Sequence, residues 1–142
     1  MSRHELDVLP EWAPGTVAVL STVGATPHAI PVSTGVRAGD RRLLIALALS
    51  RESLANLRAD PRCALTILAE GVACTARARA EIVQDPMAIS DRVAALALDV
   101  DAIQDHDQPA FELLGGVRWR WTDDEAAARD AEIRAALVDL SG

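Results

Sequence analysis

The stretch that decides the fold is Ser50-Arg-Glu-Ser-Leu-Ala-Asn-Leu-Arg-Ala-Asp-Pro-Arg62, which follows three β-like segments and precedes a fourth. Ser50 is a good N-cap residue, and Asp60-Pro61 stops the helix that follows. A helix that begins directly after a strand presents free N–H groups and a positive dipole end. With Ser50, Arg51 and Ser53 around it, this helix start is a candidate anion site. The alternative without a ligand is an ordinary strand-to-helix turn with Arg51 in solvent.

The segments around this helix predict a β-rich core. Apolar and β-branched residues fill Thr16 to Val23, His28 to Val36, Arg42 to Leu49 and Cys63 to Leu68, with turn residues between them. Pro31 inside the second segment favours an edge strand or a bulge. These elements, joined by tight turns, predict a mainly β fold with flanking helices, an antiparallel barrel of about six strands.

The next stretch, Val72 to Val83, alternates small apolar residues with polar ones and predicts a long strand with one buried face. Arg77 and Arg79 on its other face could line a ligand cavity or pair with acids across strands. Cys63 and Cys74 lack metal or redox spacing and are interpreted as buried thiols in a reducing cytosol.

The last third predicts different elements. A helix is expected over Pro86 to Leu98, a loop or weak helix over Asp99 to Pro109, and a final strand over Val117 to Thr122. Thr122 has capping-box spacing to Glu125 at the start of a C-terminal helix. Trp119 and Trp121 share one face of the expected strand, which favours core or dimer-interface packing; stacking on a cofactor ring is the other reading.

Composition narrows the function classes. The chain has 142 residues and a net charge of −7, and all 14 of its basic residues are arginine. The acidic charge argues against nucleic acid as a partner. The longest apolar run is too short to span a membrane, and no signal peptide is visible, so a single cytoplasmic domain over residues 1–142 is expected.

His28 is interpreted as a solvated turn residue, and His4 and His106 are given no role. The aspartates between Asp99 and Asp107 are interpreted as a solvated face rather than a cation site.

The order of these segments resembles the pyridoxamine phosphate oxidase-like superfamily. The resemblance rests on Asn56-Leu-Arg-Ala-Asp-Pro-Arg62 and on Pro27-His-Ala-Ile-Pro-Val32, and covers roughly residues 12–85. It implies a split β-barrel of the FMN-binding type, a homodimer, and a flavin or deazaflavin cofactor at the dimer interface. The family's phosphate site would then involve Ser50, Arg51, Ser53 and Asn56, together with Pro31, Val32 and Ser33 from the segment His28 to Val36.

Two departures from the family pattern keep a second reading open. The position three residues before Asn56, basic in many relatives, is Ser53, and the phosphate-binding arginine of true pyridoxamine phosphate oxidases aligns near Ile30. Vitamin B6 oxidation is therefore poorly supported. The resemblance favours an oxidoreductase that uses FMN or the deazaflavin coenzyme F-420 and acts on a small molecule. The alternative is a dimeric split-barrel protein of the same fold that binds a cofactor without turnover or binds none.

Overall fold

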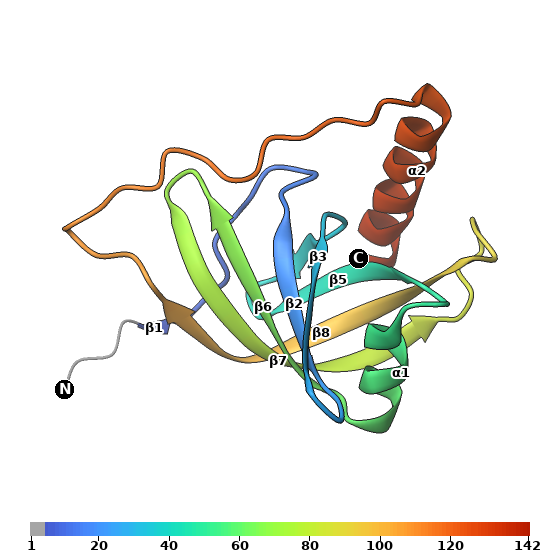
Figure 1. The fold of residues 1–142 in the computed structure, drawn as a ribbon, viewed down its shortest axis with the longest axis horizontal. Helices are drawn as coiled ribbons and strands as arrows, with labels where there is room; N and C mark the ends of the chain where they lie inside the picture. Colours follow the sequence, from blue (N-terminus) through green and yellow to red (C-terminus); the bar gives the residue numbers. More distant parts are fainter. Residues whose placement is uncertain (1–4) are drawn as a thin grey trace.

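The computed structural model describes residues 5–142 and contains one antiparallel sheet and two helices (Figure 1). Residues 1–4, with His4 among them, lie outside the described residues. The eight strands are β1 (Glu5–Leu6), β2 (Ala18–Val23), β3 (Pro27–Val32), β4 (Val36–Gly39), β5 (Arg42–Ala48), β6 (Arg62–Ala69), β7 (Val72–Gln84) and β8 (Val93–Asp105), and the helices are α1 (Glu52–Ala59) and α2 (Asp124–Ser141). The predicted antiparallel split β-barrel is confirmed, with eight strands where about six were expected.

The sheet is split between its two terminal strands. Its order is β3-β2-β6-β7-β8-β5-β4, and β1 pairs with β8. Between β3 and β4, the hydroxyl of Thr34 donates to the Ala46 carbonyl at 3.2 Å and accepts from the Ala46 N–H at 3.1 Å. The Thr34 side chain thus makes two hydrogen bonds to β5 at the place where the barrel is open between β3 and β4. Helix α1 contacts β2, β3 and β5 and so lies against the sheet near this opening.

Alternating side chains fill the inside of the barrel. In β7, Cys74, Ala76 and Ala78 are buried, whereas Arg77 and Arg79 are exposed, which agrees with the alternation predicted for this strand. The largest side chains of the core are almost completely buried; they include Leu20, Leu43, Ile45, Leu65, Ile67, Leu96 and Leu98. Burial on this scale supplies most of the driving force for folding.

A second, smaller core lies outside the barrel, beneath α2. Leu137 of α2 packs in one cluster with Leu44 of β5 and with Ala95 and Ala97 of β8. Because α2 covers their outer sides, β5 and β8 are buried on both faces over part of their length. Strands of this kind have continuous apolar sequences instead of alternating ones.

The helix predicted over Pro86 to Leu98 is wrong, because this region leads into β8. Met87 and Ser90 form an isolated bridge, and β8 runs from Val93 to Asp105 through the stretch expected to be a loop or weak helix. The Val-Ala-Ala-Leu-Ala-Leu run is apolar throughout because both of its faces are buried, so it carries no strand period.

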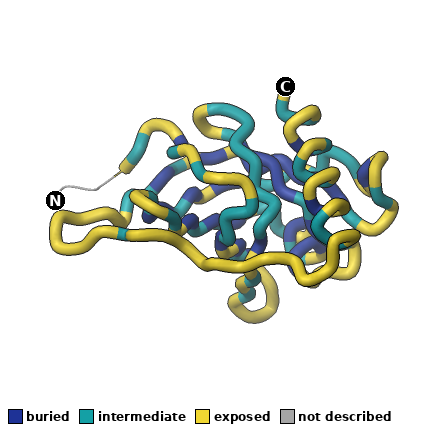
Figure 2. Tube along the Cα trace, turned by 90° about the horizontal axis from the view of Figure 1, so that it is seen from above, coloured by how far each residue is buried: buried dark blue, intermediate teal, exposed yellow. Residues whose placement is uncertain are grey.

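The prediction of a strand over Val117 to Thr122 is also wrong. Residues 106–123, which we call the arm, contain no helix or strand and run from the end of β8 to α2 (Figure 1). Most of the arm is exposed, and Figure 2 shows it as a long exposed stretch. Trp119 and Trp121 are 39% and 46% exposed, so they are not core residues. Asp123, rather than Thr122, is the N-cap of α2, and its side chain accepts from the Glu125 N–H.

Candidate functional site

The start of α1 is one residue later than the sequence indicates. The N-cap is Arg51, with extended backbone and no side-chain capping bond, whereas Ser50 lies in the preceding turn and is exposed. The Arg51 N–H already donates to the Ala48 carbonyl at 3.0 Å, which closes a turn between β5 and the helix. The first turn of α1 is therefore uncapped by a side chain, and the exposed Arg51 stands at its entrance.

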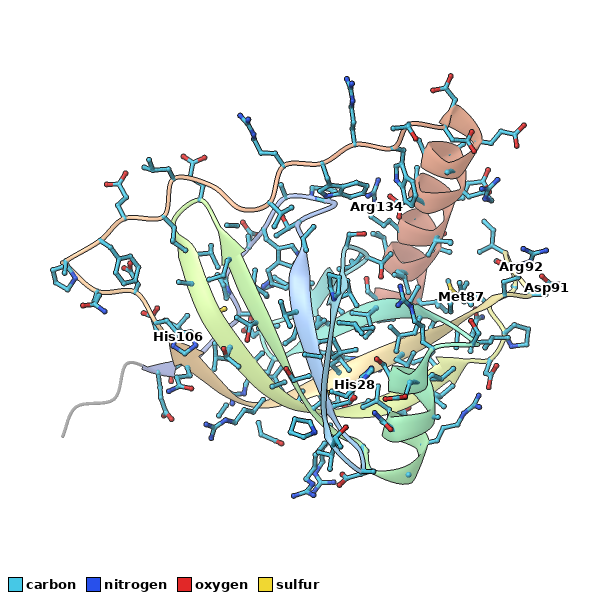
Figure 3. The ribbon with its side chains drawn as sticks, viewed as in Figure 1. His28, Met87, Asp91, Arg92, His106 and Arg134 are labelled. Atoms are coloured by element: carbon cyan, nitrogen blue, oxygen red, sulfur yellow. The ribbon has the colours of Figure 1, made fainter. Side chains whose placement is uncertain are left out.

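Ser53 and His28 form a bond that the sequence analysis missed. Ser53 is fully buried, and its hydroxyl lies 3.1 Å from Nε2 of His28 on β3. The other ring nitrogen of His28, Nδ1, lies 2.9 Å from a carboxylate oxygen of Glu52. His28 is thus a partly buried link between β3 and α1 rather than a solvated turn residue, and Figure 3 shows it beside α1. The sequence period of two could have predicted the partial burial of His28, because His28, Ile30 and Val32 share the more buried face of β3.

This chain of carboxylate, imidazole and hydroxyl has the order of a hydrolytic triad but lacks an accessible nucleophile. Because Ser53 has no exposed surface, its oxygen cannot reach a substrate carbonyl. The arrangement instead fixes the first turn of α1 against β3.

Asn56 is directed to the β2–β3 hairpin. Its side-chain amide donates to the buried Thr22 hydroxyl at 3.0 Å, and a Cβ added at Gly24 would lie 3.0 Å from its amide atoms. Gly24 therefore leaves room for this side chain. Asn56 attaches α1 to the hairpin, and it is not free to contact an anion at the helix start.

The three candidate residues at the end of β3 lie in different environments. Val32 is buried in the barrel core, Pro31 is exposed on β3 opposite Val19, and Ser33 follows the end of β3. Pro31 lies on a terminal strand of the sheet, as its missing N–H predicts.

A second arginine lies near this turn and was not identified from the sequence. The Leu49 N–H donates to the Arg92 carbonyl at 2.9 Å, so the backbone of Arg92 lies next to the residue before Ser50. Figure 3 shows Arg92 and Asp91 together in the β7–β8 connection. Because these residues are distant in sequence, only the β5–β8 pairing reveals that they are neighbours.

A shallow groove of about 380 Å³ lies over the ends of β2 and β6. Arg77 lines it, as one of the two readings of the sequence proposed, together with Arg62 and Asp101. Arg62 is held by Asp60 at 2.7 Å, and this hydrogen-bonded guanidinium lowers the pKa of Asp60 from its usual 3.8 to about 2.

Cys63 also lines the groove, but its thiol is a poor nucleophile. Burial raises its pKa to about 11, and the negative charge of Asp101 acts in the same direction. Burial raises the pKa of Cys74 to about 11 as well. Both thiols therefore remain protonated near neutral pH.

Neither a metal cluster nor a membrane span is found within residues 5–142. No group of three or more His, Cys, Asp or Glu side chains in this part of the chain is arranged to hold a metal ion. His106 instead lies 2.7 Å from the Thr75 hydroxyl. Within the same residues, no helix has the length and apolar character needed to cross a membrane.

The fold is shared with solved proteins of several activities. The chain superposes with a TM-score of 0.60 on a protein assigned as a pyridoxamine 5'-phosphate oxidase from Lactobacillus delbrueckii, at 17% identity over 72% of this chain and 98% of that one. It matches an F420 reductase with a TM-score of 0.56, at 17% identity over 68% of this chain and 98% of that one. A third match is the flavin reductase component of a bacterial two-component tryptophan halogenase. Its TM-score is 0.53, at 10% identity over 66% of this chain and 81% of that one.

At these identities the structural matches show the fold alone, and no curated protein matches the sequence. The family is shown by the sequence itself. The sequence model of the pyridoxamine 5'-phosphate oxidase family matches residues 9–115, a stretch that begins before β2 and ends within the arm. The chain therefore belongs to the pyridoxamine 5'-phosphate oxidase family and has its split-barrel fold.

Proposed function

We propose that this protein is an oxidoreductase that uses FMN or the deazaflavin coenzyme F-420, and that it binds the cofactor phosphate at the start of α1. The observation that carries the proposal is the uncapped first turn of α1 with the exposed Arg51 beside it. An uncapped helix start combines free N–H donors with a positive dipole end, and both favour a phosphate.

The groups available at this turn fit a phosphate, although they are fewer than the sequence indicated. The exposed Ser50 hydroxyl and the Arg51 guanidinium are the side-chain donors, and the backbone of Arg92 is close by. The proposal leaves Ser53 and Asn56 with a supporting role, since each is bonded to a neighbouring strand. Their bonds hold the first two turns of α1 in place, so that the donors need little reorganisation on binding.

A flavin or deazaflavin supplies hydride or electron transfer, for which the protein needs few catalytic side chains. The groove over β2 and β6 is the surface that we assign to the substrate, with Arg77 as the cation that would orient an anionic group. The proposal includes a homodimer, as the family resemblance implies. It also includes a cytoplasmic setting, in which the free thiols of Cys63 and Cys74 stay reduced.

The second candidate is a split-barrel protein of the same family without turnover. The observation that favours it is the charge around α1: Ser53 stands where many relatives have a basic residue, and Glu52 adds a carboxylate 2.9 Å from His28. An anion site with one exposed arginine and a nearby carboxylate is weaker than one with two cations.

Titration of FMN and of F-420 into the wild-type protein and Arg51→Ala tests the proposal. Arg129→Ala is the control, because Arg129 is an exposed arginine on α2 whose ion pair within residues 5–142 is a long one to Glu125, at 3.9 Å. We expect Arg51→Ala to weaken binding by about 1–3 kcal/mol, the range of a charge-assisted hydrogen bond, and Arg129→Ala to have no effect. The difference should shrink as salt is raised.

The outcomes separate the two candidates. If the wild-type protein binds neither compound, the cofactor-free reading replaces the oxidoreductase. If it binds one of them and Arg51→Ala binds equally well, the phosphate does not lie at the start of α1.

A further inference from the structure

A cavity of about 450 Å³ is lined by three segments: the one before β2, the one that enters β4, and helix α2. Its volume is within the range of small-molecule pockets. It shares no lining residue with the groove over β2 and β6. Helix α2 lies beyond residue 115, where the family match ends, so one wall of the cavity comes from outside the matched region.

The apolar part of the lining comes from all three segments. Trp12, Val36 and Val138 each contribute a side chain, and the half-buried Trp12 also packs against the barrel core. The indole N–H of Trp12 donates to the Gly35 carbonyl at 3.0 Å, which fixes the ring in the wall of the cavity. A fixed indole is a surface on which a planar apolar group can pack at a small cost in entropy.

Two arginines add positive charge to this apolar lining. Arg37 of β4 donates to the Leu9 carbonyl and to Asp40, both at 3.1 Å. Arg134 of α2 donates to Asp130 at 2.7 Å. Neither aspartate lines the cavity. Because a guanidinium has five N–H donors, each arginine keeps donors that these bonds do not use.

The surroundings of the two guanidiniums favour an anion. Arg134 lies on the side of α2 that faces the barrel (Figure 3), and a Cβ added at Gly15 would lie 3.3 Å from its Nη1 atom. The Arg37 and Arg134 side chains are only 27% and 24% exposed, so an ion pair made there is screened less than one on the open surface. The third charged residue of the lining is the exposed Glu11. Two positive charges against one negative charge favour a monoanion over a dianion or a cation.

We infer that this cavity is a second small-molecule site, which binds an organic monocarboxylate with a planar apolar body. The apolar body packs on Trp12 and Val138, and the carboxylate accepts hydrogen bonds from the unused donors of Arg37 or Arg134. The inference goes beyond the proposed function, since it needs neither a flavin nor a residue of α1.

Isothermal titration calorimetry with 2-naphthoate tests the inference. Titration with 2-naphthamide, which has the same ring system and no charge, isolates the contribution of the carboxylate. We expect 2-naphthoate to bind with a dissociation constant of about 1 mM or lower, and 2-naphthamide to bind at least about tenfold more weakly. The cation 2-naphthylmethylamine should give no measurable binding, because the lining has an excess of positive charge.

A pair of variants tests the location. Ala135 is an exposed residue of α2 that lines the cavity, so the phenyl group of Ala135→Phe should occupy space that the ligand needs. Ala128→Phe is the control, because Ala128 is an exposed alanine about 10 Å away along the same helix. We expect Ala135→Phe to weaken the binding of 2-naphthoate at least about tenfold and Ala128→Phe to keep the wild-type affinity. Circular dichroism checks that both variants fold.

Nuclear magnetic resonance of the wild type gives a readout that needs no variant. The chain has three tryptophans, so its spectrum contains few indole N–H signals. The signal of Trp12 should shift as 2-naphthoate is added, because its ring forms part of the wall.

Three results would overturn the inference. A wild-type protein that does not bind 2-naphthoate would remove the site, and equal affinities for the acid and the amide would remove the carboxylate from its ligand class. Unchanged binding by a folded Ala135→Phe, or a Trp12 signal that does not move, would place the acid elsewhere on the protein. The flavin titration with Arg51→Ala tests the proposed function separately, since Arg51 does not line this cavity.

Discussion

Helix α1 and the arm both lie outside the sheet, and the chain holds them in different ways. Helix α1 buries Ser53, Leu54 and Leu57 and is bonded by side chains to both β2 and β3. The arm, which is more than twice as long, buries no residue. It is held by main-chain bonds at its two ends and at Leu113, by the His106 ring and by two indoles. The contrast shows that a segment can have a regular sequence pattern without being packed: among residues 5–142, α1 has bonded partners on two strands, whereas residues 117–122 pair with no strand.

The largest difference between the two segments should appear when an apolar side chain is truncated. Leu57→Ala removes a 5% exposed side chain from the core and should cost about 2–4 kcal/mol of unfolding free energy. Val117→Ala on the arm should change it by less than about 0.5 kcal/mol, because Val117 is mostly solvated. Urea denaturation of dilute protein measures both; equal losses would mean that the arm is packed within one chain.

A smaller difference is expected for the polar attachments. Asn56→Ala leaves the buried Thr22 hydroxyl without its donor and should cost about 1–2 kcal/mol. Trp119→Phe also removes one donor, but its acceptor, the Gly15 carbonyl, is reached by water, so the loss should be below about 1 kcal/mol. The same denaturation curves compare them. A larger loss for Trp119→Phe would reverse the ranking of the two attachments.

The smallest effect concerns the turn after α1. The depressed pKa of Asp60, about 2, means that its ionised form is favoured by the folded state. Its contribution to stability is therefore complete above the usual pKa of 3.8 and is lost as pH falls toward 2. Asp60→Asn should flatten the dependence of the urea midpoint on pH between about 4 and 2, and only slightly, because the group is partly exposed to solvent. Asp91→Asn, at an exposed loop position, should retain the wild-type dependence; equal slopes for wild type and Asp60→Asn would contradict the assignment.

Sequence patterns predicted the elements whose two faces differ. β7 alternates because one face is buried and the other exposed, and α1 was identified from its position between a strand and Asp60-Pro61. Alternation cannot identify a strand when both of its faces are buried. The first half of β8, Val93–Leu98, is covered on both sides, and the sequence predicted a helix there. The prediction of a strand over Val117 to Thr122 failed for the opposite reason, since these alternating residues pair with no strand of the part of the chain that the structure describes.

The sequence predicted the turn before α1 as the candidate site, but not the contacts that its residues make. Arg51 is the N-cap of α1, and Ser50, which the sequence predicted as the N-cap, lies one residue before it. The partners of Ser53 and Asn56 come from β3 and β2, and Arg92 comes from beyond β7. These contacts depend on strand register, which a single sequence does not specify at this separation.

The position of β8 in the sheet bears on how the protein is made. β8 pairs with β7, β5 and β1, so a chain still attached to the ribosome before residue 93 emerges leaves both β5 and β7 with open edges. Open edges are templates for aggregation. The nascent barrel should therefore resist proteolysis only after Asp105 has left the exit tunnel, which a series of stalled chains of increasing length would reveal. Until then the half-built sheet is a substrate for chaperones.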